Sequence, residues 1–337
     1  MATYKTQRSI ARRMVLPLAV QNAIGQTMAD AEFVRSELME TTSFFQRTPM
    51  LEDDSAYAGK GHSFTSDVRL IGWQSNGEVS TRADHWIAGW MLAMTLGKEA
   101  FTAGVGGAAN THLLSWLDAA DAAPLANIYI EDTVGLKRKW LDMACSQVVI
   151  GASKVGACTI KGTFMGGGQV ISGALAAIPD YEVKPPLLYG QNAVVMLGPT
   201  GAPVSMVPRV RSWEATFSHA VEEVRQPGVG DYAAFLRYGL PTMKLNITID
   251  ANDSADIQTW MEERTELECR IVITSAGTTL TLDWPRIILP KSDLGEQDKY
   301  VGYTLQLDEK SILKPTGTEI FTASLTNLVD EYLVPAA

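Results

Sequence analysis

The chain has 337 residues, of which 46% are hydrophobic and 20% charged, a composition that is ordinary for a globular protein. Its 38 acidic against 28 basic residues give a formal net charge of −10, which argues against broad binding to nucleic acid or to an anionic membrane. That charge is compatible with a protein that lets DNA pass without holding it. The length predicts two packed units or one large β domain.

The sequence gives no strong sign of a membrane segment, an export signal or a disulfide framework. The apolar stretch Trp86–Gly97 is too short to span a bilayer, and Pro17 interrupts the apolar part of the basic N-terminus. Cys145, Cys158 and Cys269 are scattered and form no CxxC pair. We therefore expect a soluble protein of a reducing compartment in which the three thiols are small buried side chains.

Residues 1–58 lack clean strand alternation and are predicted to form an N-terminal arm. Within them, Phe33, Val34 and Leu38 cluster in a way that favours a helix over residues 29–40. An ordinary extension packed on the following domain is an equally good interpretation.

A strand and an apolar helix are predicted next, over residues 62–97. Alternation in HSFTSDVRLIGW indicates the strand, Ser80 or Thr81 could cap the helix, and Gly97 is a natural stop. The apolar positions of the helix recur at helical spacing: Trp86, Trp90 and Met94. Because this is the most apolar stretch of the chain, we expect the helix in the core.

The residues after this helix read as a loop. Gly104 to Ala109 match GxGxxA, the permissive form of a dinucleotide-binding turn, but no buried strand precedes them and no useful helix follows. We therefore assign them no cofactor. LANIYIEDTVG reads as a short strand, and two strands joined by a turn follow within residues 146–166. The predicted inward set of these two strands is Val148, Ile150, Cys158, Ile160 and Phe164.

A charge-free, glycine-rich segment then leads to PDYEVKPP, the clearest linker in the chain. The predicted organisation is an arm over residues 1–58, a first β domain over 59–178, a linker over 179–190 and a second β domain with a C-terminal strand over 191–337. In the second domain, residues 193–224 read as one long hairpin, followed by a loop over 222–238. The uncharged part of that hairpin is a candidate interface.

The most regular unit runs from Thr242 to Pro290. Its first strand alternates an apolar set with a polar set: Met243, Leu245, Ile247 and Ile249 against Lys244, Asn246, Thr248 and Asp250. Asp253 or Ser254 is placed to cap a short helix, and a hairpin turns at Ser275-Ala276-Gly277. We expect the apolar set in the core and the polar set on the opposite, exposed face of the strand. Trp260→Ala should cost roughly 3–5 kcal/mol if Trp260 is core.

Strand, short helix and hairpin occur in this order twice, over residues 62–166 and again over 242–308. Each helix carries a Trp-Met pair, Trp90-Met91 in the first and Trp260-Met261 in the second. Although the spacings differ, the pattern predicts a domain duplication rather than a solenoid.

No constellation typical of catalysis or metal binding stands out. The four histidines lie far apart and outside any HExxH motif: His62, His85, His112 and His219. Asp84-His85 could be a base with an orienting carboxylate, but a helix-capping Asp84 is the better interpretation. DANDSAD, residues 250–256, lacks the glycine and the distal Glu of a calcium loop. The carboxylates of Glu262-Glu263, Glu266 and Glu268 read as a solvated face.

We therefore predict no catalytic, cofactor-binding or metal-binding residue and no enzymatic activity. The inventory of antiparallel strands, long uncharged loops and scattered aromatics is instead that of an assembly subunit.

The order of these elements resembles the major tail tube proteins of long non-contractile, siphovirus-type phage tails. The matching segments are VRLIGWQSNGEVSTRADHWIAGWMLAMTLG, LANIYIEDTVG, QVVIGASKVGACTIKGTFMGGG, PRVRSWEATFSHAVE, TMKLNITIDANDSADIQTWM, ECRIVITSAGTTLTLDWPRIILP and YVGYTLQLDE. They span roughly residues 60–325 and share strand order and loop position rather than a short motif.

The resemblance implies a mainly β protein: an antiparallel β-sandwich or barrel of the tail tube type with short flanking helices. Such subunits form rings with an inner β-barrel, and the rings stack through long loops and terminal arms into a conduit for genome ejection. With two tube folds per chain, we expect a trimeric ring with pseudo-sixfold symmetry, and a hexamer is the alternative.

The partners that the resemblance implies are the protein itself, a tape measure protein, and tail terminator and tail tip proteins. Genomic DNA would pass through without specific binding, and an acidic lumen would repel its phosphates. The protein would reside in the virion tail tube after assembly in the host cytoplasm, without a membrane.

Two other functions stay open. A contractile-tail or secretion-type tube would use similar sheets. A carbohydrate-active β-sandwich would need a cleft with paired carboxylates and aromatics.

Overall fold

The computed structural model describes twelve stretches of the chain: residues 12–17, 20–38, 45–53, 68–117, 123–132, 137–153, 155–177, 186–226, 231–250, 255–290, 295–297 and 300–334. His62, the predicted caps Asp253 and Ser254, and the linker up to residue 185 lie outside these residues.

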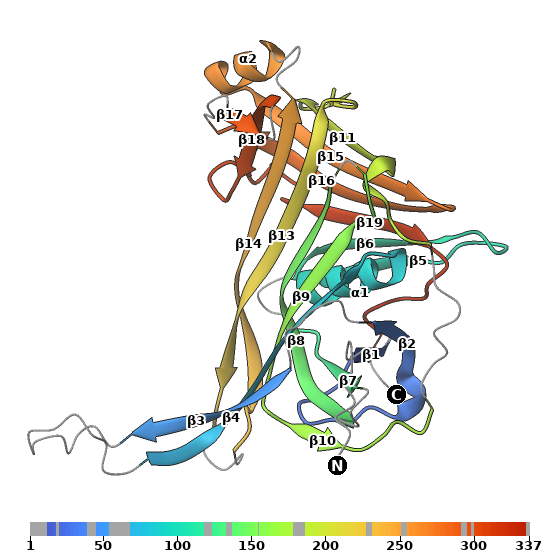
Figure 1. The fold of residues 1–337 in the computed structure, drawn as a ribbon, viewed down its shortest axis with the longest axis vertical. Helices are drawn as coiled ribbons and strands as arrows, with labels where there is room; N and C mark the ends of the chain where they lie inside the picture. The colour runs from blue at the N-terminus through green and yellow to red at the C-terminus, as the bar shows by residue number, and fades with distance from the viewer. Residues whose placement is uncertain are drawn as a thin grey trace, which may run out of the picture.

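The protein is mainly β; within the stretches described, every strand pair is antiparallel and there are two α-helices (Figure 1). The larger sheet has the order β17-β18-β14-β13-β8-β7-β1-β2, and β9 and β10 pair with β8, β4 with β9, and β3 with β4. Its strands are β1 (Arg12–Pro17), β2 (Phe33–Leu38), β3 (Gln46–Asp53), β4 (Val68–Arg82), β7 (Ala126–Asp132), β8 (Lys137–Ser153), β9 (Thr159–Gly166), β10 (Val170–Ser172), β13 (Val210–Val224), β14 (Phe235–Asp250), β17 (Gly295–Gln297) and β18 (Tyr300–Leu307).

The smaller sheet has the order β12-β11-β15-β16-β19-β6-β5, and its strands run across the direction of β13 and β14 (Figure 1). They are β5 (Gly97–Thr102), β6 (Asn110–Trp116), β11 (Ala193–Pro199), β12 (Val204–Ser205), β15 (Glu266–Ser275), β16 (Thr278–Ile288) and β19 (Thr322–Asn327). The helices are α1 (His85–Leu96), α2 (Ala255–Glu263) and the 3-10 turns η1 (Asp30–Glu32) and η3 (Gly190–Asn192).

Helix α1 lies in the core, as its sequence predicts, and contacts β8 and β13 of the larger sheet and β5, β6 and β19 of the smaller one. Every residue from Trp86 to Leu96 is buried, because a helix that is apolar all round needs protein on every side. The predicted caps Ser80 and Thr81 are wrong, since both lie in β4. Asp84 caps α1, accepting hydrogen bonds from the backbone N–H of Trp86 (2.8 Å) and Ile87 (3.0 Å).

Both sheets mix strands from the two predicted domains. In the larger sheet, β8 pairs with β13, and in the smaller one β6 pairs with β19. One hydrophobic cluster runs through both sets of strands. The two predicted units therefore share their sheets and one core.

The predicted inward sets are confirmed. Met243, Leu245, Ile247 and Ile249 of β14 are buried, as are Val148, Ile150, Cys158, Ile160 and Phe164. The cysteines are buried free thiols, and burial raises the pKa of Cys145 and Cys158 to about 12.

Three local predictions are wrong. Residues 33–38 form β2 rather than a helix, because Val15 and Phe33 pack in a small cluster of their own where β2 pairs with β1. The loop predicted after α1 is the hairpin β5–β6, whose glycine-rich part is only its turn. The long hairpin is β13–β14 rather than residues 193–224, since β13 pairs with β14 and β8 while β11 pairs with β15.

Helix α2 follows β14 as predicted, but Trp260 is only half-buried at the edge of the core. Ile257 is the fully buried residue of this helix. The two Trp-Met pairs of the sequence therefore occupy different environments. The cost predicted for Trp260→Ala assumed that Trp260 is a core residue, and this assumption is wrong.

Asp142 in β8 is a buried carboxylate in left-handed backbone (φ 57°). It accepts hydrogen bonds from Gln21 Nε2 (2.9 Å) and the Gly25 N–H (2.7 Å), and burial raises the pKa of its carboxyl. A raised carboxyl pKa means that the fold loses stability as the pH rises through it.

Asp142→Asn keeps the accepting oxygen and tolerates left-handed backbone while removing the buried charge. We expect it to raise the unfolding free energy at neutral pH by roughly 1 kcal/mol. The gain should shrink toward acid pH, where the wild-type carboxyl is protonated. Chemical denaturation of both proteins across this pH range checks the prediction, and a gain independent of pH would contradict it.

Candidate assembly face

One face of the larger sheet is polar across six neighbouring strands, β4, β9, β8, β13, β14 and β18. The register places the residues of this face in rows that cross the strands, and all but Val149 and Gly151 are polar. One row is Arg82, Thr159, Gly151, Glu214, Asn246 and Gln306. A second is Ser80, Lys161, Val149, Thr216 and Lys244, and a third is Glu78, Thr163, Gln147, Ser218 and Thr242. The opposite face of the same strands carries the core.

The polar set predicted from the sequence, Lys244, Asn246, Thr248 and Asp250, lies on this face. Its charges are nearly balanced. Lys161 pairs with Glu78 at 2.7 Å, and Arg211 with Asp250 at one end. The remaining side chains are mostly hydroxyls and amides, which hydrate well without creating a strong field.

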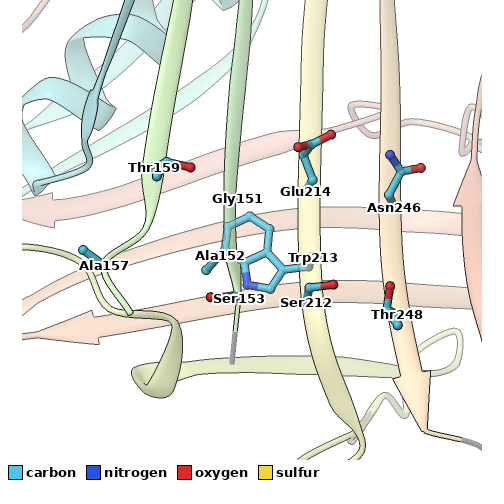
Figure 2. Close-up of a pocket in the computed structure, with 10 residues that line it drawn as sticks. All are labelled: Gly151, Ala152, Ser153, Ala157, Thr159, Ser212, Trp213, Glu214, Asn246 and Thr248. Atoms are coloured by element: carbon cyan, nitrogen blue, oxygen red, sulfur yellow. The ribbon is translucent and has the colours of Figure 1, made fainter. Parts of the chain in front are cut away.

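A hollow of about 480 Å³ opens on this face where β8, β13 and β14 run side by side (Figure 2). Gly151 lines the hollow. A larger residue would not fit there, because its Cβ would lie 2.8 Å from the Trp213 carbonyl oxygen. The rim is hydroxyl- and amide-rich, with Ser212, Asn246 and Thr248 beside one carboxylate, Glu214. A single carboxylate without an acid or base partner gives no general acid–base pair.

The six-stranded unit has two open edges among the described residues. At one end, residues 77–80 of β4 pair with β9 on one side, whereas β3 pairs only with residues 68–76. At the other end, residues 305–307 of β18 pair with β14 on one side, whereas β17 reaches only residues 300–302. Unpaired strand edges are templates for pairing with another chain.

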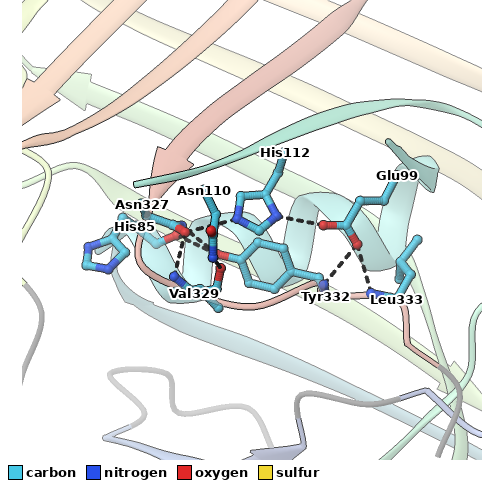
Figure 3. A network of polar contacts seen from close by, with 8 residues as sticks. All are labelled: His85, Glu99, Asn110, His112, Asn327, Val329, Tyr332 and Leu333. Atoms are coloured by element: carbon cyan, nitrogen blue, oxygen red, sulfur yellow. Dashed lines mark hydrogen bonds and ion pairs between the residues drawn. The ribbon is translucent and has the colours of Figure 1, made fainter. Parts of the chain in front are cut away.

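The buried polar network around His112 is the closest approach to a catalytic constellation (Figure 3). His112 Nδ1 lies 2.7 Å from Glu99 Oε1, and Nε2 lies 3.0 Å from Asn327 Oδ1. Asn327 Nδ2 donates to the Tyr332 hydroxyl at 2.8 Å, and Glu99 Oε2 accepts from the backbone N–H of Tyr332 and Leu333.

The network is sealed, because the side chains of His112 and Glu99 are 0% and 1% exposed. The network binds the segment that follows β19. It holds this segment against α1 through the backbone of Tyr332 and Leu333 and the Tyr332 hydroxyl (Figure 3). This arrangement holds the fold together and offers a substrate no access.

The other described histidines take no part in this network as side chains. His219 packs edge-on to Trp116 and its ring nitrogen Nδ1 faces the Gly239 carbonyl oxygen at 3.1 Å. Burial lowers the pKa of His85 and of His219. Asp84 caps α1 and pairs with Arg35 at 2.7 Å, which accords with the capping interpretation of Asp84-His85.

Within the described stretches, no group of His, Cys, Asp and Glu side chains is arranged to hold a metal ion. Neither described α-helix is long and apolar enough to cross a bilayer. Glu266 forms an exposed ion pair with Arg286, but Glu268 is only 9% exposed and pairs with Arg270 at 2.8 Å, so the predicted solvated face is wrong for Glu268.

No protein-family model matches the chain, and no curated protein matches it. The sequence missed the open edges and the His112 network, because both depend on which distant strands become neighbours. The alternation in β14 was the one signal that pointed to the polar face.

Proposed function

We propose that the protein is a virion structural protein, the major tail tube subunit of a long non-contractile phage tail. The observation that carries the proposal is the six-stranded antiparallel unit with one polar face, one core face and two open edges. We propose no catalytic activity and no cofactor.

An even number of alternating strands allows such units to join into a ring. Because β4 and β18 run in opposite directions, β18 of one copy meets β4 of the next copy in antiparallel orientation. Repeating this heterologous contact closes a ring whose inner wall is one continuous sheet, and closure removes every free edge. The polar face then lines the lumen.

The proposed lumen differs from a strongly acidic one. The three rows carry three basic and two acidic side chains, Arg82, Lys161 and Lys244 against Glu78 and Glu214. Phosphate binding requires several Lys or Arg side chains close together. Because this face lacks such a basic cluster, DNA would pass without being held. The excess acidic charge of the chain would lie elsewhere on the subunit.

Hydrogen exchange of the free and the assembled protein tests this proposal. Alternate amides of residues 77–80 and 305–307, whose N–H groups face away from β9 and β14, should exchange slowly only after assembly, because they then become hydrogen-bonded. The mass of the smallest ring should equal three chains of 36.6 kDa for the pseudo-sixfold ring, or six for the hexamer. Assembled protein in which both edges still exchange as in the monomer would rule out this ring.

A further inference from the structure

The hollow on the polar face is bordered by four side chains whose hydrogen-bonding capacity is unused. Ser212, Glu214, Asn246 and Thr248 all line it (Figure 2), and within the described stretches none of their side chains has a hydrogen-bond or ion-pair partner. The Asn246 amide and the two hydroxyls can both donate and accept, whereas the Glu214 carboxylate only accepts. The hollow therefore presents donors and acceptors side by side.

The strand register places these four side chains at the corners of a small rectangle. In the β13–β14 pair, Glu214 lies opposite Asn246 and Ser212 lies opposite Thr248. Side chains directly opposite each other on one face of a sheet are about 5 Å apart, and the next pair along the strands is about 7 Å away. Because the corners stand on paired strands rather than on loops, this arrangement is already formed before any ligand arrives.

The strand beside this rectangle leaves room for a ligand. In the β8–β13 pair, Gly151 lies opposite Glu214 and carries no side chain, and the small Ser153 lies opposite Ser212. The resulting volume of about 480 Å³ is within the range of sites that bind small molecules.

The chemistry of the lining excludes three classes of ligand. None of the lining residues is Lys or Arg and one is a carboxylate, so an anion would be repelled. A bound Mg²⁺ or Ca²⁺ takes most of its ligands from carboxylates and other oxygens, and the described residues hold no such acidic group. An apolar ligand would cover the polar side chains without giving them partners.

We propose that this hollow binds one neutral sugar ring. The hydroxyls of a sugar donate and accept like the lining, so neighbouring hydroxyls can donate to Glu214 and accept from the Asn246 amide. Ser212 and Thr248 then serve the next hydroxyls of the same ring. Because the site offers few hydrogen bonds and little apolar area, we expect weak binding. The inference goes beyond the proposed function, since a conduit needs no bound sugar.

Saturation-transfer NMR of the unassembled full chain tests the site with defined probes. The neutral probes are methyl β-glucopyranoside, methyl α-mannopyranoside and methyl β-galactopyranoside, and glucose 6-phosphate is the anionic comparison. At least one neutral probe should receive saturation from the protein. The anionic sugar should bind at least tenfold more weakly, because Glu214 repels its phosphate.

Two variants show whether the bound sugar lies in the hollow. Asn246→Leu removes the amide at similar volume and should raise the Kd of the neutral probe about tenfold or more, and Glu214→Gln, which weakens one acceptor, should raise it less. Gln147→Leu is the matched control, since it removes an amide from the same face outside the hollow and should leave the Kd unchanged.

No saturation of any neutral probe, or the same Kd for Asn246→Leu as for the wild type, would overturn the sugar site. So would equal binding of glucose 6-phosphate. Tubes assembled by a wild type that binds no sugar would overturn this inference alone. Sugar binding by a chain that never assembles would instead support the site and contradict the proposed function.

Discussion

His112→Ala should lower the unfolding free energy by about 3–5 kcal/mol, because it leaves Oε1 of the buried Glu99 without its partner. The hydrogen-bond pattern fixes which atoms of the site donate and which accept. Asn327 Nδ2 donates to the Tyr332 hydroxyl, so Asn327 Oδ1 must accept, and His112 Nε2 carries a hydrogen. The contact between His112 Nδ1 and Glu99 Oε1 then needs one shared proton.

Glu99→Gln is the matched control for this prediction. A glutamine oxygen can accept from the backbone N–H of Tyr332 and Leu333, and its amide nitrogen can donate to His112 Nδ1. The cost should therefore stay within about 1–2 kcal/mol. Denaturant unfolding of both variants measures the difference, and equal losses would show that the hydrogen bonds do not set the stability here.

His112→Ala should also loosen the segment after β19. Glu99 holds the backbone of Tyr332 and Leu333, and the Tyr332 hydroxyl donates to the His85 carbonyl oxygen at 3.3 Å. Faster hydrogen exchange in residues 328–334, with the strands of the larger sheet unchanged, is the expected local result. Uniform loosening of the whole fold would contradict a local fastening role.

Trp90→Ala should cost about 3–5 kcal/mol, because it removes the largest fully buried side chain of α1. Trp90 stacks on Trp86 with ring centroids 6.4 Å apart and lies 6.0 Å from Phe164 of β9. Its Nε1 has no acceptor among the described residues, so the loss measures packing rather than a hydrogen bond.

Trp260→Ala is the natural comparison, since the sequence places the same Trp-Met pair in α2. Because Trp260 is half-buried at the edge of the core, its removal should cost about 1–2 kcal/mol. Thermal or denaturant unfolding of the two variants gives the ranking. Equal losses would mean that α2 is held as firmly in the core as α1.

These two tryptophans show how far sequence patterns reach. Local alternation and helical spacing predicted β14, the β15–β16 hairpin and both helices, since each depends on neighbouring residues. The same patterns could not separate Trp90 from Trp260, because the difference is whether a second sheet covers the helix.

Longer-range features were out of reach for the same reason. His112 and Asn327 are 215 positions apart and meet only because β6 pairs with β19. β8 and β13 come from different predicted domains, and their pairing depends on the whole sheet. The β5–β6 hairpin was not predicted, because the glycine-rich residues 104–109 indicate only its turn and do not indicate the two strands beside it.

Electron cryomicroscopy of the purified, assembled protein tests the central claim most directly. The account predicts tubes of stacked rings with an open lumen, in which β18 of each copy pairs with β4 of the next and Lys161, Glu214 and Asn246 face the lumen. Filaments without a lumen, or a ring in which this polar face lies outward, would contradict it.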